Sequence, residues 1–251
     1  KRQPLGPEYT EAWHRGEPAA VALGTRGDTD LDHLIRIFVL HEHVPATLLS
    51  DVLGARLAAK LLDSGVAQTD EHGTVYVAYD IRPHVIVGRN RLVFSDVDAS
   101  LVDHVPGADH VLGVGSASLS LLHSTPTSPV SSVLDLGTGS GVQLLGQLDS
   151  AERIVATDVH ERALDLARAT VTAADATHRV DLRSGSWFDP VAGERFDRIV
   201  ANPPFVVGLP EVGHVYRDSG LNLDGASELV VSQVTEHLNP GGTAHLLSLI
   251  H

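Results

Sequence analysis

The stretch "VLDLGTGSGVQLLGQ", residues 133–147, joins an apolar run to three closely spaced glycines. Gly137 and Gly139 would let the backbone turn tightly and approach a ligand, and Gly141 would allow close packing of a following helix. No Lys-Ser or Lys-Thr pair follows the glycines, which excludes a phosphate-binding P-loop. The pattern therefore indicates a nucleotide-type site, with a purely structural turn as the alternative.

Two acidic residues narrow the class of ligand. Asp158 ends the next predicted strand, roughly 20 residues further on, where a carboxylate can accept from both ribose hydroxyls. Asp135 stands just before the glycines. A carboxylate there is unfavourable beside a pyrophosphate and suits a cationic ligand or an amino group. This pattern favours S-adenosylmethionine, with its sulfonium and ammonium groups, over NAD.

The segment "ANPPF", residues 201–205, ends a later predicted strand. Pro203 and Pro204 restrict the backbone and remove two N–H donors, which leaves the neighbouring carbonyls free to accept hydrogen bonds. Asn202 offers an acceptor and a donor, and Phe205 offers a stacking face. Together they suit a planar amine whose nitrogen is aligned on a methyl donor by positioning. A strand terminator with a capping Asn is the structural alternative.

The elements around these motifs alternate regularly from residue 132 onward. Apolar strand patterns at 132–137, 153–158, 179–185, 196–204 and 242–250 are separated in part by helical patterns at 141–148, 161–174 and 225–238. Near-continuous apolar strands alternating with helices predict an α/β fold with a parallel, doubly wound, Rossmann-like sheet. The carboxyl ends of parallel strands face the ligand crevice, which is where both motifs stand.

The N-terminal part has a different pattern. Three short helices are predicted within 28–42, 45–54 and 55–67, the first with Asp28 or Asp30 as N-cap and the third ending near Gly65, followed by strands at 73–83 and 91–96. This is the order of a small α+β winged-helix-like domain. Its third helix carries only Arg56 and Lys60 as cations, which favours a packing role over nucleic-acid binding. We therefore expect an N-terminal arm at 1–28, a winged-helix-like domain at 29–95, a linker or substrate-side segment at 96–131, and the α/β domain at 132–251.

Composition excludes several classes of protein. The net charge of −14 over 251 residues argues against broad non-specific binding of nucleic acid, and the absence of Cys excludes disulfides and thiolate metal sites. No apolar run approaches the ~20 residues of a membrane span, and the first residues do not form a secretory signal, so we expect a cytoplasmic protein. His41 and His43 are too sparse to predict a metal site.

Residues 132–250 resemble class I S-adenosylmethionine-dependent methyltransferases. "LDLGTGSG" resembles their motif I, "ATD" their acidic second strand end, and "NPPF" the (N/D)PP(Y/F) motif of amine N-methyltransferases. The nearest group is the "methyltransferase small domain" group, which includes release-factor glutamine methyltransferases and rRNA guanine-N2 methyltransferases. "HVLGVGSASL", "GSWFDPV" and "YRDSGL" resemble an actinobacterial branch that has its own N-terminal helical domain.

The resemblance implies roles for individual residues. Asn202, Pro203, Pro204 and Phe205 would hold the target amine and form the catalytic set. The cofactor would bind to Asn202 and to eight residues nearer the glycine motif: Asp135, Gly137, Thr138, Gly139 and Gly141 at its methionine end, Asp158 at the ribose, and Ser186 and Trp187 at the adenine. Many relatives have Asp where Ser186 stands, and a serine hydroxyl accepts more weakly.

We therefore expect an N-methyltransferase that uses S-adenosylmethionine and acts on a planar amine. A nucleobase in rRNA is the first candidate substrate, a protein glutamine is the alternative, and a non-enzymatic binding module is the third possibility. The family sheet has seven strands, whereas the pattern here reaches the fifth at His251, so we expect further chain or a partner at that edge.

Overall fold

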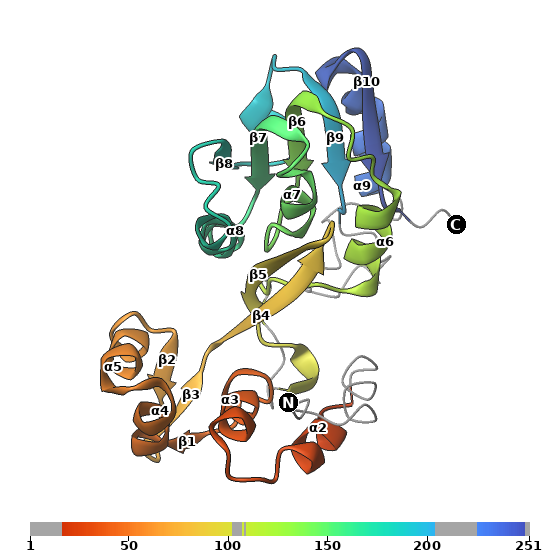
Figure 1. Cartoon of the computed structure of the whole chain (residues 1–251). Helices are drawn as coiled ribbons and strands as arrows, with labels where there is room; N and C mark the ends of the chain where they lie inside the picture. Colours follow the sequence, from red (N-terminus) through yellow and green to blue (C-terminus); the bar gives the residue numbers. More distant parts are fainter. Residues whose placement is uncertain (1–16, 102–106, 108, 204–224, 249–251) are drawn as a thin grey trace. The chain divides into compact units, whose positions relative to one another are not determined.

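A computed structural model describes residues 17–101, 107, 109–203 and 225–248 (Figure 1). The chain divides into two compact units, the first formed by Lys1–Ile81 with Asp96–Val105 and the second by Arg82–Ser95 with Pro106–His251. The division differs from the boundaries expected from sequence, because Arg82–Ser95 groups with the α/β part rather than with the helical part.

The first unit has the element order of a winged helix. Its helices and strands in chain order are α2 (Pro18–Gly24), α3 (Asp30–Phe38), β1 (Val44–Pro45), α4 (Ala46–Leu53), α5 (Ala55–Asp63), β2 (Ala67–Thr69) and β3 (Thr74–Val77). The strands form an antiparallel sheet in the order β1-β3-β2. The helices pack on it through one buried cluster: Ile37, Val44, Leu49, Ala58, Ala67, Val75 and Val77.

One sequence expectation in this unit was wrong in detail. Thr29 is the N-cap of α3, not Asp28 or Asp30, because its hydroxyl accepts from the Asp32 backbone N–H while the Asp32 carboxylate accepts from Thr29, a reciprocal capping box. The third helix ends at Asp63, close to the end near Gly65 that the sequence predicts. Gly65, at φ +73°, follows the helix end, and Ala67–Thr69 then pairs with β3 as a strand.

The predicted strand at 73–83 is divided at Ala78. Its first part is β3, and its second part is β4 (Tyr79–Ile86), which pairs with β5 (Arg89–Asp96) in a separate two-stranded sheet. The division between the two units falls after Ile81, within β4. A short 3-10 helix, η1 (Ala99–Leu101), follows.

The second unit is the predicted α/β fold. After α6 (Ser116–Ser124) its elements are β6 (Val130–Leu136), α7 (Val142–Gln147), β7 (Ala151–Asp158), α8 (Glu161–Ala173), β8 (Val180–Ser184), η2 (Asp189–Val191), β9 (Phe196–Ala201), α9 (Gly225–Gln233), η3 (Val234–His237) and β10 (Leu238–Leu246). The five strands are all parallel in the order β10-β9-β6-β7-β8 (Figure 1). The order reverses at β6, so the carboxyl end of β6 is the switch point of the sheet.

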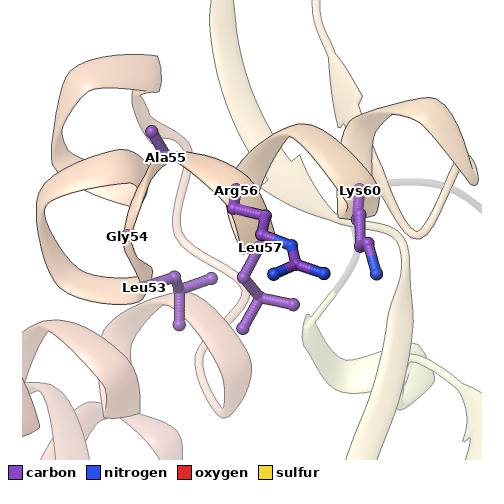
Figure 2. A pocket seen from close by; sticks show the side chains of 6 residues that line it. All are labelled: Leu53, Gly54, Ala55, Arg56, Leu57 and Lys60. Atoms are coloured by element: carbon purple, nitrogen blue, oxygen red, sulfur yellow. The ribbon is translucent and has the colours of Figure 1, made fainter.

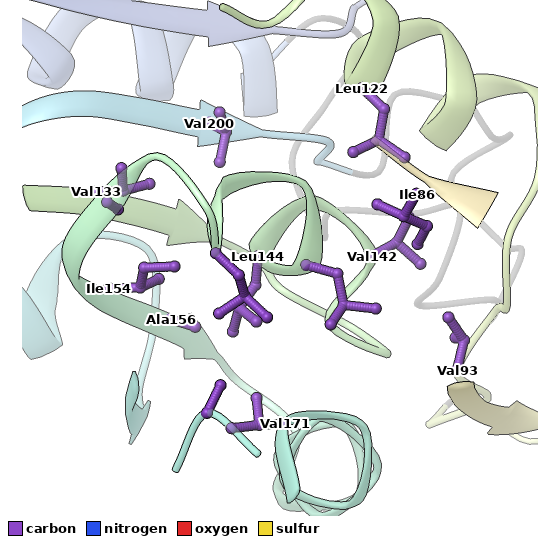
Figure 3. Close-up of a cluster of buried hydrophobic side chains, with 14 residues drawn as sticks. Ile86, Val93, Leu122, Val133, Val142, Leu144, Ile154, Ala156, Val171 and Val200 are labelled. Carbon is purple, nitrogen blue, oxygen red and sulfur yellow. The ribbon is translucent and has the colours of Figure 1, made fainter. Parts of the chain in front are cut away.

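Both faces of this sheet are buried. Val133 and Ile154 pack with Leu122, Leu144 and Val171 of α6, α7 and α8 on one face (Figure 3). The neighbouring positions, including Leu134 and Val155, turn to the other face and pack with Val230 of α9, Val234 of η3 and Phe196. This alternation explains why the strands are apolar throughout, as parallel strands covered on both faces must be.

The far part of the β4–β5 hairpin belongs to the core of the second unit. Ile86 and Val93 are each 2% exposed within the same cluster as Val133. Arg89 forms an ion pair with Asp149, and the Phe94 backbone N–H donates to the Thr170 hydroxyl of α8. These contacts explain why residues 82–95 group with the α/β part. Among the helices of the described residues, none is long and apolar enough to cross a membrane.

Candidate active site

Strand register brings the sequence motifs to one edge of the sheet. Leu136 at the end of β6 lies opposite Thr157 of β7 on one side and Ala201 of β9 on the other. Gly137, Asp158 and Asn202 each follow directly from these three aligned positions. The glycine turn is thus flanked by the predicted ribose acid and the predicted methyl-acceptor residue, at the switch point where Rossmann-like sheets bind ligands.

The glycine turn leaves open space above its backbone. Gly137 and Gly139 have φ values of +70° and +54°, and a Cβ built on either would meet no atom within 4 Å. The turn is held from below, because the Thr138 backbone N–H donates to the Thr157 carbonyl at 2.8 Å. A Cβ built on Gly141, at φ +83°, would lie 3.5 Å from the Thr170 side chain and 3.7 Å from Ala167 Cα, both in α8, which agrees with close packing of the helix. The backbone here can be approached by a ligand without displacing any side chain.

Asp135 lies beneath the turn rather than beside its open face. It is 1% exposed, and its Oδ2 accepts from the Thr138 hydroxyl at 2.7 Å and from the Leu144 backbone N–H at 3.0 Å. Its Oδ1 is buried without a hydrogen-bond partner in the described part of the chain. The described contacts of this carboxyl are therefore internal to the turn, whereas the sequence interpretation directed it at a cationic ligand.

This burial changes the protonation of Asp135. Desolvation raises the pKa of the carboxyl from 3.8 to about 7, the hydrogen bonds from Thr138 and Leu144 oppose the rise, and the negative charge of Asp158 adds to it. A carboxyl that is largely neutral in weakly acidic solution explains how this group tolerates a position with one unpartnered oxygen.

Asp158 joins the glycine turn to the next helix. Its Oδ2 accepts from the Gly139 backbone N–H at 2.9 Å, and its Oδ1 accepts from the His160 backbone N–H at 3.0 Å ahead of α8. The residue is half-buried, and its carboxylate has further lone pairs that can accept hydrogen bonds. The carboxylate is thus held rigidly beside the turn, in a position that suits the predicted ribose contact.

Ser186 and Trp187 follow the end of β8, the strand next to β7. Ser186 is exposed, and its carbonyl accepts from the Asp189 backbone N–H. Trp187 has φ +47° and packs partly against the buried cluster that contains Leu134 and Val230. Such a conformation is uncommon for a bulky residue and requires support from its surroundings. The adenine contact predicted for this pair stays a prediction.

Asn202 and Pro203 follow β9 directly. Pro203 is buried, and Asn202 is half-buried with an Oδ1 that is inaccessible to solvent and has no hydrogen-bond partner among the described residues. An unpaired buried acceptor costs free energy unless a ligand supplies the donor. The other two residues of the predicted catalytic set, Pro204 and Phe205, lie outside the described residues.

Sequence reasoning missed two polar residues that attach the preceding segment to this site. Ser140, within the glycine turn and 3% exposed, donates through its hydroxyl to the Leu112 carbonyl at 2.8 Å. Gln143 of α7, 5% exposed, donates through its side-chain amide to the Ser118 carbonyl of α6 at 2.9 Å. The signal that could have revealed Ser140 is a polar residue between two glycines, where turn geometry alone needs no hydroxyl.

The two sparse histidines have structural partners. His41 is hydrogen-bonded to the Val77 carbonyl through Nδ1, and His43 Nδ1 lies 2.6 Å from the Asp70 carboxylate. No group of three or more potential metal ligands occurs in the described residues.

The residues at the sheet edge fit S-adenosylmethionine on three structural grounds. The open space above the backbone of Gly137 and Gly139 can admit the methionine part of the cofactor. The carboxylate of Asp158 can accept hydrogen bonds from the ribose hydroxyls. The Asn202 acceptor lies at the end of the adjacent strand. Asp135 supports the turn from below and need not contact the ligand.

Comparison with known proteins identifies the family of the chain. Residues 110–246 match the family model "Methyltransferase small domain", and residues 2–78 match "Domain of unknown function (DUF7059)". A release factor glutamine methyltransferase of Xylella fastidiosa is 31% identical over 201 residues, covering 74% of this chain and 68% of the relative. A release factor glutamine methyltransferase of Geobacter sulfurreducens is 38% identical over 125 residues, covering 44% of this chain and 42% of the relative.

A solved structure shares the fold. The Thermus thermophilus 16S rRNA N2 G1207 methyltransferase, in complex with AdoMet and guanosine, superposes with a TM-score of 0.50 at 21% identity, covering 78% of this chain and 53% of that one. With the family model spanning more than half of the residues, the chain belongs to the methyltransferase small domain family and is an S-adenosylmethionine-dependent methyltransferase.

Proposed function

We propose that the chain methylates a planar nitrogen, and that Asn202 binds the acceptor NH₂ group. The observation that carries this proposal is the Asn202 Oδ1, a buried acceptor without a partner among the described residues, next to the glycine turn on the adjacent strand. A neutral amide oxygen accepts a hydrogen from an amine or amide NH₂ and orients the nitrogen lone pair.

The reaction requires positioning more than acid–base chemistry. S-adenosylmethionine supplies an electrophilic methyl group, so a new N–C bond forms as the S–C bond breaks and the sulfur keeps the electron pair. Asn202 holds the acceptor nitrogen. The ring of Pro203 restricts the backbone next to Asn202 and removes an N–H donor there. The surplus proton leaves the product nitrogen to solvent after transfer. Alignment of this kind is a large part of rate enhancement in such reactions.

For the acceptor we favour a side-chain amide in a protein. The net charge of the chain is −14, which opposes association with the phosphates of RNA. The relatives that are at least 30% identical include release factor glutamine methyltransferases. An rRNA nucleobase is the second candidate, supported by the winged-helix-like element order of the first unit.

The test combines acceptor identity with one variant. Tritiated cofactor is offered with a bacterial release factor or with undermodified ribosomes, and we expect label in the release factor. Asn202→Ala should abolish transfer while S-adenosylmethionine affinity by calorimetry stays within about three-fold, because the lost contact is with the acceptor. Asn90→Ala, at an exposed hairpin position, is the matched control and should keep full activity.

Each result bears on a separate part of the proposal. Label only in the rRNA, after it is separated from the ribosomal proteins, would move the acceptor to RNA and keep the planar nitrogen. Loss of cofactor binding in the Asn202 variant would make that residue structural, and the proposed acceptor contact would then be wrong.

A further inference from the structure

A groove lies at the turn between α4 and α5 of the first unit. It has a volume of about 410 Å³ and is lined by Leu53, Gly54, Ala55, Arg56, Leu57 and Lys60. Figure 2 shows the Leu53 and Leu57 side chains pointing to the same side of the turn, with the Arg56 guanidinium beside Leu57. The groove therefore has an apolar floor and a cationic rim.

The phase of α5 keeps its groove side chains outside the core. Ala58 is 2% exposed and packs inward, whereas Leu57 is 46% exposed and both Arg56 and Lys60 are exposed. Leu53, at the end of α4, is half-buried and packs partly against the core cluster of the first unit. Gly54, at φ +81°, ends α4 and begins α5 within one residue, and nothing lies within 4 Å of a Cβ built on it.

The two cations of the groove are unpaired. Arg56 and Lys60 are four residues apart on one helix face, and neither has an ion-pair partner among the described residues. Between residues 17 and 81 the only other Lys and Arg residues are Arg26 and Arg36, against ten Asp and Glu. The groove is thus a small positive site on an acidic unit, and it complements negative charge locally.

The chemistry of the groove favours a peptide over a nucleic acid. Binding of RNA or DNA draws its affinity from several phosphate contacts, which two cations on an acidic unit do not provide. An apolar floor also offers nothing to a phosphate, whereas it fits one aliphatic side chain. Carboxylates on either side of that side chain would then reach Arg56 and Lys60.

We propose that the α4–α5 groove docks an acidic protein segment, with one aliphatic side chain between Leu53 and Leu57 and flanking carboxylates on Arg56 and Lys60. This surface is independent of the acceptor proposed above, since it lies in the other compact unit and its test measures binding rather than methyl transfer.

The test uses the full chain and defined probes. The first probe is a short fluorescein-labelled peptide of Glu, Asp and Ser with one central Leu. The second probe is the same peptide with Ser in place of the Leu, and the third is the same peptide with Lys in place of the acidic residues. The fourth probe is a single-stranded RNA of similar length. Fluorescence anisotropy at low salt should show binding of the first peptide and at least about tenfold weaker binding of the other three.

Variants locate the binding to the groove. The double variant Arg56→Glu with Lys60→Glu should weaken binding of the first peptide by about tenfold or more, because two attractions become repulsions. Arg26→Glu should change the affinity for that peptide by less than about twofold. Leu57→Ser should weaken it clearly, whereas Leu31→Ser, at a position 43% exposed on α3, should not. Circular dichroism checks that each variant is folded.

Several outcomes would overturn the proposal. These are no binding of the first peptide, equal binding of the Lys peptide, tighter binding of the RNA, or an unchanged affinity in either groove variant. Loss of peptide binding in the groove variants with methyl transfer intact supports the docking surface alone, so the two proposals can fail separately.

Discussion

The buried carboxyl of Asp135 makes the stability of the second unit depend on pH. Its pKa is raised by burial from 3.8 to about 7 in the folded state, so between these values the folded protein holds a proton that the unfolded chain releases. Stability must therefore fall as pH rises through this window and level off above the folded pKa. The full separation corresponds to about 4 kcal/mol, of which more than half is lost between about pH 5 and about pH 8.

Asp135→Asn tests this reasoning. The amide cannot titrate, and its oxygen can still accept from Thr138 and Leu144, so the variant should lose the pH dependence and keep the turn. Any cost of burying the amide NH₂ is the same at every pH. The difference in unfolding free energy between the parent and the variant should thus change by about 2–3 kcal/mol across this range, in favour of the variant at high pH.

Urea unfolding at a series of pH values measures this difference, with Trp187 fluorescence reporting on the second unit in a Trp13→Phe background. Asp197→Asn is the matched control, because contacts led by the Asn239 amide lower the pKa of Asp197 and its titration falls below the tested range. Parallel curves for the parent and Asp135→Asn would refute the assignment of a raised pKa to this carboxyl.

Three further predictions follow from the described contacts. Asp158→Ala should weaken the binding of S-adenosylmethionine by about 1–3 kcal/mol in calorimetric titration, and an unchanged affinity would contradict the ribose contact. Ser140→Ala should reduce turnover more than cofactor affinity, because it releases the Leu112 segment from the turn; Ser140→Thr should restore part of the rate, and equal losses would indicate a general collapse of the site. Asp197→Asn should destabilise the fold at neutral pH, and the difference from the parent should close as pH falls from 3.8 through the lower pKa of the folded state, because the stability that a lowered pKa contributes is lost over that interval; a gap that persists in stronger acid would argue against it.

Much of the site was accessible from local patterns. The glycine turn, the acid that ends β7 and the NPP segment all stand at the ends of apolar runs, and alternating strands and helices require a parallel sheet whose carboxyl ends meet at one edge. For this reason the sequence predicts that Gly137, Asp158 and Asn202 are neighbours. The register of β6 with β7 and with β9 agrees with that prediction.

The orientation of side chains was decided only by tertiary packing. Asp135 was predicted to lie beside the ligand, and that contact stays a prediction. The hydrogen bond that its carboxyl accepts from the Leu144 N–H of α7 is the contact that packing decides. The link from Ser140 to Leu112 joins residues that no periodicity relates. The hairpin at 82–95 groups with the α/β part because Ile86 and Val93 fill its core.

The sequence by itself therefore determined which elements form and which motifs reach the sheet edge, because these depend on the spacing of residues along one chain. The tertiary structure decided which polar atoms are satisfied, which are left for a ligand, and which face of α5 remains open. Those outcomes depend on contacts between distant segments, and no local pattern contains them.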